Sequence, residues 1–218
     1  LCIMNAVLLF IETASPICSV CVSRGKEVIA TANSTTPNTH AGVLAVLIRQ
    51  VLEKAKVSVR ELQAVCVSEG PGSYTGLRIG LSTAKGICYA AELPLILIPT
   101  LQAMAHGIKK YASAGSTILP VLDARRSDVY FSLFNYELEE LIAHTCSSVS
   151  EVNVLVEQRQ LKAVAAGTGT EKFAPFTQNI SVVEETVIDA ANMVPIGLEK
   201  FYRNDFADLA YAEPVYRK

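Results

Sequence analysis

The sequence has neither a run of lysine and arginine residues nor a long hydrophobic segment. Its 19 basic and 21 acidic residues leave a formal net charge of −2. A protein that holds nucleic acid alone normally carries a basic stripe, so we expect another protein to hold most of any RNA. The longest apolar runs, such as residues 93–99, are far too short to cross a bilayer. Residues 7–11 lack the basic flank and the length of a signal peptide, and we expect a cytoplasmic protein.

Signatures of disulfide and metal chemistry are also missing. The six cysteines are scattered and do not form a disulfide framework. Cys18 and Cys21 spell C-x-x-C, but their segment alternates like a strand, and residues three apart on a strand point to opposite faces. The histidines His40, His106 and His144 are isolated, and none has a second histidine one helical turn away. We therefore predict no metal site.

What the sequence does have is enough apolar content for a substantial core, since half of its 218 residues are hydrophobic. Hydrophobic periodicity and turn residues predict the order βββαβαβα in the first half. The expected strands are 7–11, 18–23, 26–34, 64–68 and 95–98, and the expected helices are 39–56, the segment from the glycine-rich turn to about 91, and 101–111.

The second half repeats this order of elements, although not the letters. The expected strands are 118–123, 128–135, 140–146, 162–166 and 180–183, and the expected helices are 149–158, a short one after Gly169, and 190–206. Two such units with a cleft between them form the plan of the actin, sugar-kinase and Hsp70-type (ASKHA) ATPases, whose mixed sheets carry helices on both faces. We predict this α/β fold with two lobes, 1–112 and 113–218, divided at Ser113–Ser116.

A glycine-rich turn, "EGPGSYTGLRIG" at residues 69–80, follows one predicted strand and opens a helix. Such turns often hold phosphate, because the backbone and the positive end of the helix can approach an anion closely. The spelling fits neither common phosphate motif. A Walker loop needs Lys and Ser/Thr where Leu77 and Arg78 stand, and a dinucleotide fingerprint needs glycine in place of Thr75. Two interpretations stay open: a phosphate cradle, or glycines that serve backbone geometry and close helix packing.

In the ASKHA architecture, the turn after the first strand of each half faces the nucleotide phosphates, and a later loop faces the adenosine. The candidate cleft residues are Glu12, Thr13, Ser15, Asp123, Gly167 and Gly169. Glu12 ends a predicted buried strand and could hold a metal-bound water or poise a nucleophile, and Asp123 is the matching acid of the second half. The alternative is that both acids cap turns, and a lone Gly-x-Gly is a weak signal.

The predicted helix 39–56 has apolar residues on nearly two faces, whereas a helix that covers a sheet needs one. One stripe contains Leu44, Leu47, Ile48, Val51 and Ala55, and Val43, Val46 and Leu52 lie beyond it. The next helix places Gly76, Gly80 and Ala84 four residues apart, a smooth face that another helix could approach closely. These helices either pack tightly within one core or form a protein–protein interface.

Six motifs follow one another along nearly the whole chain. They are "LLFIETASPICSVCV", "SEGPGSYTGLRIGLSTAKGICYAAELPLILIPTLQAMA", "VLDARRSDVYFSLF", "AAGTGTEKF", "AANMVPIGLEKF" and "AEPVYRK". In this order they resemble the signatures of the bacterial TsaB (YeaZ) family, which is also labelled an M22 glycoprotease family. The chain departs from the family at Glu12, where most members have Asp, and at residues 1–5, which precede the usual start.

The resemblance implies a subunit of the machinery that forms N6-threonylcarbamoyladenosine next to the anticodon of tRNA. In the family, TsaC makes threonylcarbamoyl-adenylate, TsaD transfers the threonylcarbamoyl group to tRNA, and TsaE is an ATPase that binds the assembled complex. TsaB-like proteins share the ASKHA fold of TsaD without its metal site and act as its non-catalytic partner. By this resemblance the chain meets tRNA only through the complex and binds no cofactor tightly, although ATP or ADP with Mg²⁺ can lie at the partner interface.

Two positions support a non-catalytic role. Where TsaD-like proteins have two metal-binding histidines four residues apart, this chain has Thr100 and Met104. A hydroxyl and a thioether are poor replacements for two imidazoles at an iron or zinc centre.

The resemblance also assigns the two apolar helices. In the family they form the homodimer face, and TsaD uses the same face, so that the two assemblies compete. The interface candidates are Val43, Leu44, Leu47, Gly76, Ile79, Gly80 and Thr83.

An enzyme is the competing hypothesis. A nucleotide-dependent ATPase or phosphotransferase would use Glu12 and Asp123 with Mg²⁺. An M22-type peptidase would need a metal site, and the isolated histidines argue against it.

Overall fold

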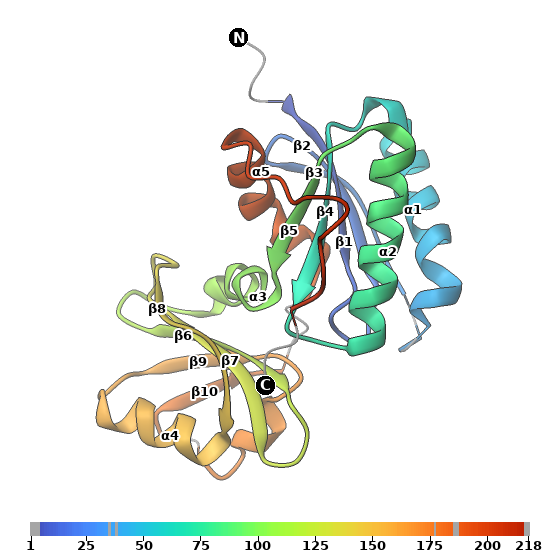
Figure 1. Cartoon of the computed structure of the whole chain (residues 1–218). Helices are drawn as coiled ribbons and strands as arrows, with labels where there is room; N and C mark the ends of the chain where they lie inside the picture. The colour runs from blue at the N-terminus through green and yellow to red at the C-terminus, as the bar shows by residue number, and fades with distance from the viewer. Residues whose placement is uncertain (1–4, 35, 38, 177, 185–187, 216–218) are drawn as a thin grey trace. The chain divides into compact units, whose positions relative to one another are not determined.

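The computed structural model describes residues 5–34, 36–37, 39–176, 178–184 and 188–215. Residues 1–4 of the segment before the usual family start and residues 216–218 of the last motif lie outside them. The chain forms two compact units, shown together in Figure 1. The first contains the residues up to Thr100 and the segment Asp189–Val215, and the second contains Leu101–Ile188.

The first unit is built on a five-stranded mixed sheet in the order β3-β2-β1-β4-β5. Its strands are β1 (Val7–Glu12), β2 (Ser19–Arg24), β3 (Glu27–Asn33), β4 (Ala64–Gly70) and β5 (Leu95–Pro99). The central strand β1 pairs antiparallel with β2 and parallel with β4. Five of its six residues are buried, as expected for a strand covered on both faces.

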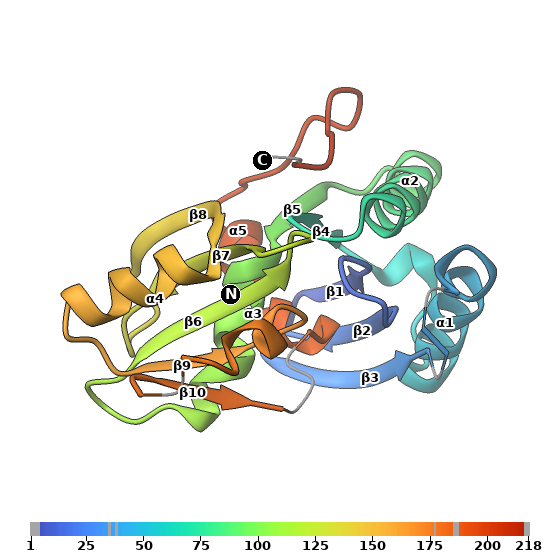
Figure 2. The same ribbon diagram turned by 90° about the horizontal axis from the view of Figure 1, so that it is seen from below.

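Helices α1 (His40–Ala55) and α2 (Tyr74–Ala91) cover one face of this sheet, and α5 (Val194–Tyr202) covers the other (Figures 1 and 2). Successive residues of β1 point to opposite faces. Ile11 therefore belongs to the cluster formed with Leu44 of α1 and Leu81 of α2. Phe10 faces α5, where a Cβ on Gly197 would lie 2.5 Å from its ring.

The second unit repeats this pattern with the strand order β10-β9-β6-β7-β8. Its strands are β6 (Thr117–Asp123), β7 (Asp128–Phe134), β8 (Glu140–Ser148), β9 (Ala163–Ala166) and β10 (Ile180–Val183). The central strand β6 pairs antiparallel with β7 and parallel with β9. Helix α4 (Val149–Gln158) packs on one face of the sheet, and the part of α3 (Thr100–Ile108) that follows Thr100 packs on the other. The predicted duplicated α/β architecture is confirmed.

The structure corrects the predicted boundary at 112/113. Ser113–Ser116 connects a 3-10 turn to β6 inside the second unit, and the units divide at Thr100/Leu101. The predicted last helix is also shorter, since a 3-10 turn (Ala190–Met193) precedes α5, and α5 ends at Tyr202.

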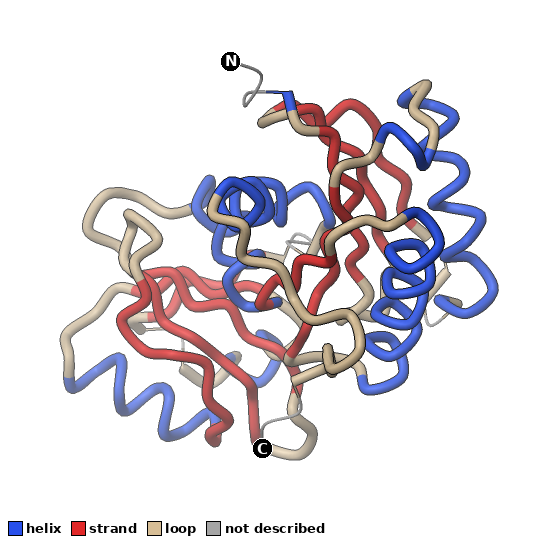
Figure 3. The backbone as a smooth tube through the Cα atoms, turned by 45° about the horizontal axis from the view of Figure 1, so that its top comes forward, coloured by secondary structure: helices blue, strands red, loops and turns tan. Residues whose placement is uncertain are grey.

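The physical reason for this correction is that Leu101, Met104 and Ile108 of α3 pack in the core of the second unit. The chain also returns to the first sheet after Ile188. The segment that follows α5 has no helix or strand of its own up to Val215 (Figure 3). It runs along the first sheet, where the Ala207 N–H donates to the Leu95 carbonyl at 2.8 Å and the Val215 N–H to the Glu69 carbonyl at 2.7 Å. Among the described residues, no helix is long and apolar enough to cross a membrane.

Candidate functional site

The glycine-rich turn packs against the end of β1. A Cβ added to Gly72 would lie 2.5 Å from the Ala14 Cβ, and one added to Gly76 would lie 2.1 Å from the Thr13 carbonyl oxygen. Nearby, the Ser73 N–H donates to the Ala14 carbonyl at 2.7 Å. The Ser73 hydroxyl caps α2 by accepting from the Gly76 N–H at 3.2 Å. The glycines therefore serve close packing of the turn against the end of β1.

The structure places the small residues of α2 within the core of the first unit. Gly80 and Ala84 do not point outward, because Gly80 lies against the Thr13 side chain and Ala84 is fully buried. Within the chain, these small residues pack against its own sheet. The interpretation of tight packing within one core is the one that the structure supports for them.

Four of the seven interface candidates are buried within the first unit. Leu44 and Leu47 of α1 are 2% and 7% exposed, and Gly76 and Gly80 of α2 are buried. The other three candidates, Val43, Ile79 and Thr83, are half-buried. The interface itself stays a prediction, but these four residues are core residues in the isolated chain.

The side chains that α1 and α2 do present outward differ from the predicted set. We define the outer face of these helices as Val46, Tyr74, Arg78, Ser82 and Tyr89, all of which are exposed. The Arg78 guanidinium carbon lies 4.0 Å from the centre of the Tyr74 ring, a cation–π geometry. Tyr89 is 81% exposed.

Glu12 is enclosed at the end of β1 and is 1% exposed. Its Oε1 accepts from the Ala14 N–H at 2.6 Å. Burial raises the pKa of this carboxyl to about 7, and the negative charge of Asp189 adds to the rise, while hydrogen bonds from Ala14 and Ser68 oppose it. A carboxyl with this pKa suits proton transfer at neutral pH, but within the first unit it is enclosed and bonded to the chain's own backbone.

Asp189 ties the returning segment to β2 and β3. It caps the 3-10 turn by accepting from the Ala191 N–H at 2.8 Å, and its other oxygen accepts from the Asn33 amide at 3.3 Å. The Ser19 hydroxyl accepts from the Ala190 N–H at 2.9 Å and donates to Asn33 at 2.7 Å. This network fixes the segment beside Glu12, and Asp189 is a neighbour that the sequence did not reveal.

The two hydroxyl candidates of the first unit do not face solvent. Thr13 is fully buried, and a Cβ on Gly80 would lie 2.1 Å from its Oγ1. Ser15 is 3% exposed, and its Oγ donates to the Ile17 carbonyl at 2.9 Å. Neither hydroxyl is placed to donate to a phosphate within this unit. The adjacent His40, an isolated histidine at the start of α1, is also buried, and burial lowers its pKa.

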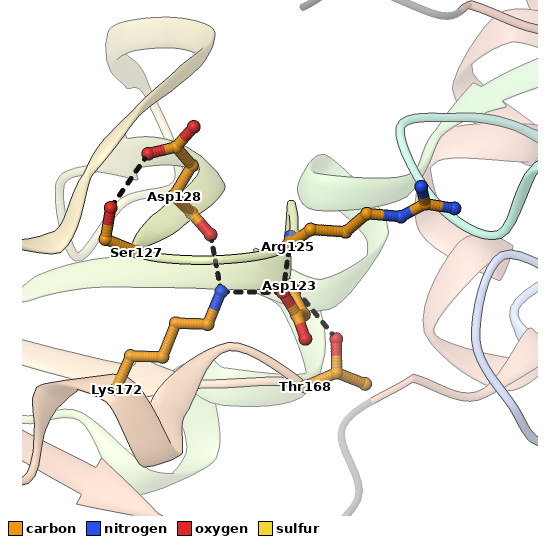
Figure 4. Close-up of polar contacts among 6 residues, drawn as sticks. All are labelled: Asp123, Arg125, Ser127, Asp128, Thr168 and Lys172. Carbon is orange, nitrogen blue, oxygen red and sulfur yellow. Dashed lines mark hydrogen bonds and ion pairs between the residues drawn. The ribbon is translucent and has the colours of Figure 1, made fainter.

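Asp123 of the second unit is paired with a lysine (Figure 4). The Lys172 ammonium lies 2.6 Å from Asp123 Oδ1 and 2.7 Å from the Asp128 carbonyl oxygen. The same Oδ1 accepts from the Arg125 N–H at 2.6 Å. Lys172 is the main reason that the pKa of Asp123 lies below its ordinary value. A cation supplied by the protein thus lies beside the carboxylate that the sequence suggested as a candidate Mg²⁺ ligand.

Gly167 and Gly169 pack against β6 of the second unit. Gly167 has a φ of +127°, and a Cβ there would lie 2.0 Å from the Val121 carbonyl oxygen and 2.5 Å from the Met104 methyl. A Cβ on Gly169 would lie 2.9 Å from Val129. Within this unit, both glycines of the Gly-x-Gly loop thus pack directly against β6 and β7.

The cleft candidates belong to separate units, with Glu12, Thr13 and Ser15 in the first and the other three in the second. Within the described part of the chain, no group of three or more His, Cys, Asp or Glu residues is arranged to hold a metal ion. Thr100 and Met104 are 0% and 1% exposed, and Met104 packs in the second unit's core. Their chemistry and surroundings do not fit a metal centre.

Comparison with known proteins identifies the relatives of this chain. The family model "TsaD: tRNA N6-adenosine threonylcarbamoyltransferase" matches residues 28–214. The tRNA threonylcarbamoyladenosine biosynthesis protein TsaB of Escherichia coli is 30% identical, over 96% of this chain and 93% of that protein. The chain belongs to the TsaB (YeaZ) family. The resemblance seen in the six sequence motifs is confirmed.

Solved structures place this TsaB-family chain in its fold class. A Pseudomonas aeruginosa protein described as similar to peptidase YeaZ matches with a TM-score of 0.85 at 22% identity, over 98% of this chain and 100% of that one. An activator of 2-hydroxyisocaproyl-CoA dehydratase from Clostridium difficile, solved with bound ADPNP, matches with a TM-score of 0.54 at 10% identity, over 91% and 97% of the two chains. The ASKHA fold class predicted from element order is therefore confirmed.

Proposed function

We propose that this chain is a non-catalytic subunit of the complex that forms N6-threonylcarbamoyladenosine in tRNA, and that it supports a TsaD subunit in the cytoplasm. The observation that carries the proposal is the nearly full-length match to TsaB relatives. Thr100 and Met104 agree with it, since TsaD-type chemistry needs a metal-ligand pair that these two residues do not supply.

The competing enzyme functions lack support in either unit. Glu12 is enclosed by its own turn, and Asp123 is paired with Lys172, so neither carboxylate is free to bind Mg²⁺ within its unit. The buried Thr13 and Ser15 hydroxyls do not offer a phosphate site in the first unit. We therefore propose that the isolated chain binds no nucleotide tightly, and that ATP or ADP with Mg²⁺ is held only once a partner completes the site.

We propose the outer face of α1 and α2 as the surface that pairs with TsaD, and with a second copy when the chain is alone. TsaE would join the assembled complex. The exposed residues of this face include two tyrosines and an arginine, residue types that are enriched among the strongest contributors to protein interfaces. The half-buried Val43, Ile79 and Thr83 extend the same surface at its edge.

Reconstitution tests the function directly. Transfer RNA should acquire threonylcarbamoyladenosine when TsaC, TsaD, TsaE, ATP and this chain are combined, and should not when this chain is omitted. Equal modification without the chain, or magnesium-dependent ATP turnover by the chain alone, would contradict the proposal.

Sedimentation tests the surface. Ser82→Arg places a charge on the exposed side of α2 and should abolish association with TsaD, because an unpaired charge buried in an interface costs several kcal/mol. The matched control is Ser150→Arg on the exposed side of α4 in the other unit, which should associate as the wild type does. Unchanged association of the Ser82 variant would place the partner elsewhere.

A further inference from the structure

The β6–β7 hairpin of the second unit has a firmly anchored tip that carries two adjacent arginines. The Ala124 N–H donates to the Asp128 carbonyl at 3.1 Å, and the Asp128 N–H donates to the Arg125 carbonyl at 3.0 Å. Ala124 is 5% exposed and anchors the turn in the unit, whereas Arg125 and Arg126 are both exposed. The backbone of the tip is therefore held in place while its two guanidinium groups face solvent.

Both arginines adopt a backbone conformation that a side chain disfavours. The φ angles of Arg125 and Arg126 are +71° and +47°, in the left-handed region that glycine occupies without steric cost. Strained residues of this kind are concentrated at functional sites. The hairpin thus carries arginine at two successive positions where glycine would make the same turn more easily.

The acids beside the tip have other partners. Asp123 binds Lys172 and the Arg125 N–H, and Asp128 accepts from the Ser127 hydroxyl at 3.3 Å. Figure 4 shows the Arg125 side chain extending away from the Asp123–Lys172 pair. Across the described residues, none forms a hydrogen bond or an ion pair with the guanidinium of Arg125 or Arg126. Lys172 pairs with Asp123, and the Ser127 hydroxyl leaves the Asp128 charge in place, so the tip keeps an excess of positive charge from its two exposed arginines.

We infer that Arg125 and Arg126 contact backbone phosphates of the tRNA, so that this subunit contributes directly to tRNA binding. Planar guanidinium groups form paired hydrogen bonds with phosphate, and two on a rigid turn can reach neighbouring phosphates. A net charge of −2 makes this contact a local addition to the partner's binding rather than a complete binding surface. The inference rests on the proposed function, which supplies tRNA as the polyanion.

The test replaces both arginines with asparagine, which tolerates left-handed backbone and so preserves the turn. Affinity of the TsaD-containing complex for tRNA is measured at several salt concentrations. The double variant Arg125→Asn/Arg126→Asn should bind roughly tenfold more weakly near physiological salt, and the slope of log affinity against log salt should fall by about 1 for each arginine. Weak tRNA binding by the isolated chain at low salt should fall in parallel.

The control removes the same charge from the opposite end of β6. The backbone carbonyl of Lys162 accepts from the Thr117 N–H, which places Lys162 beside the start of that strand. The residues Arg159 and Lys162 are both exposed. Arg159→Asn/Lys162→Asn should therefore leave affinity and slope unchanged. Equal tRNA affinities for the hairpin variant and the wild type would overturn the inference. It would also be overturned if the hairpin variant lost ATP binding or TsaD association but bound tRNA as the wild type does.

This design separates the inference from the proposed function. If wild-type chain neither joins TsaD nor supports tRNA modification, the proposed function fails. The isolated chain then still decides the inference, because a hairpin-specific loss of its weak tRNA binding supports the phosphate contact and equal binding by both variants rejects it.

Discussion

Gly80 of α2 lies directly against Thr13 at the end of β1, so closely that a Cβ on this glycine would fall 2.1 Å from the threonine Oγ1. The contact joins the first helix after the glycine-rich turn to the central strand of the sheet. It makes Gly80 a core position, although its spacing with Gly76 and Ala84 also fits a helix–helix interface. The first prediction follows from this distance.

Gly80→Ala should destabilise the chain by about 1–3 kcal/mol, because the added methyl overlaps Thr13 and the neighbouring backbone must shift. The matched control is Gly86→Ala in the same helix, where an added Cβ meets nothing within 4 Å. That control should stabilise the chain by about 0.5–1 kcal/mol through the helix preference for alanine. Urea unfolding measures both free energies.

A double variant separates this overlap from other effects of the substitution. Thr13→Ala removes the Oγ1 that lies 2.1 Å from the added carbon, so Thr13→Ala/Gly80→Ala should lose less stability than the sum of the single changes. Additive losses would show that the Gly80 methyl is accommodated elsewhere.

Glu12→Gln should remove a pH dependence of stability. The folded-state pKa of Glu12 is about 7, above the ordinary 4.5, so the folded state binds the proton more tightly than the unfolded state does. The stability contribution is therefore complete below about pH 4.5, falls as the pH rises to about 7, and is constant above that. Glutamine, which stays neutral, should make the chain more stable than wild type at pH 8, by on the order of 2 kcal/mol, with little difference at pH 4.5. Urea unfolding between pH 4.5 and 8 measures the free energy of unfolding of both proteins. If the two plots of this free energy against pH ran parallel, Glu12 would be charged when buried.

Much of the fold could be predicted because its signals are local. A continuous run of apolar residues from Val7 to Ile11 predicts β1, and the glycine-rich turn predicts the start of α2, which Ser73 caps. The order of strands and helices then suffices for the fold class. Such signals depend only on neighbours in the sequence.

The rest depends on contacts between distant parts of the chain. The packing of α3 on the second sheet moved the domain boundary, and Asp189–Val215 returns to the first sheet. No local pattern indicates which sheet such a segment joins. The pairing of Lys172 with Asp123 spans 49 residues. The only sequence signal for it was a lysine shortly after the Gly-x-Gly of the loop that packs on β6.

Lys172→Met should release Asp123 and change stability mainly above the acid range. The paired carboxyl has a pKa below its ordinary 3.8, so its contribution is present above that pH and is lost as the pH falls through the folded-state pKa. The pair is partly exposed, so the loss at pH 7 should be roughly 0.5–1 kcal/mol and should shrink towards pH 2. Urea unfolding and an NMR titration of Asp123 measure both effects. The exposed Lys162→Met is the control, and a Lys172 effect of equal size at pH 2 and pH 7 would argue against an ionic origin.

Lys85→Met should loosen the segment that follows α5. The Lys85 ammonium on α2 donates to the carbonyls of Ala210 and Ala212 at 3.3 and 3.2 Å, on either side of Tyr211.

Tyr211 is 82% exposed, which makes it a reporter for local opening by chymotrypsin. Hydrogen bonds to a charged donor contribute about 1.5–3 kcal/mol when buried and less here, so loss of about 1 kcal/mol should raise cleavage after Tyr211 by about fivefold. Lys54→Met on the exposed side of α1 removes the same charge without touching the segment and should leave cleavage unchanged. If both variants are cleaved at the wild-type rate, the segment is held by the packing of Leu209 and Ala212 and by its backbone bonds to Leu95 and Glu69, and Lys85 only covers it.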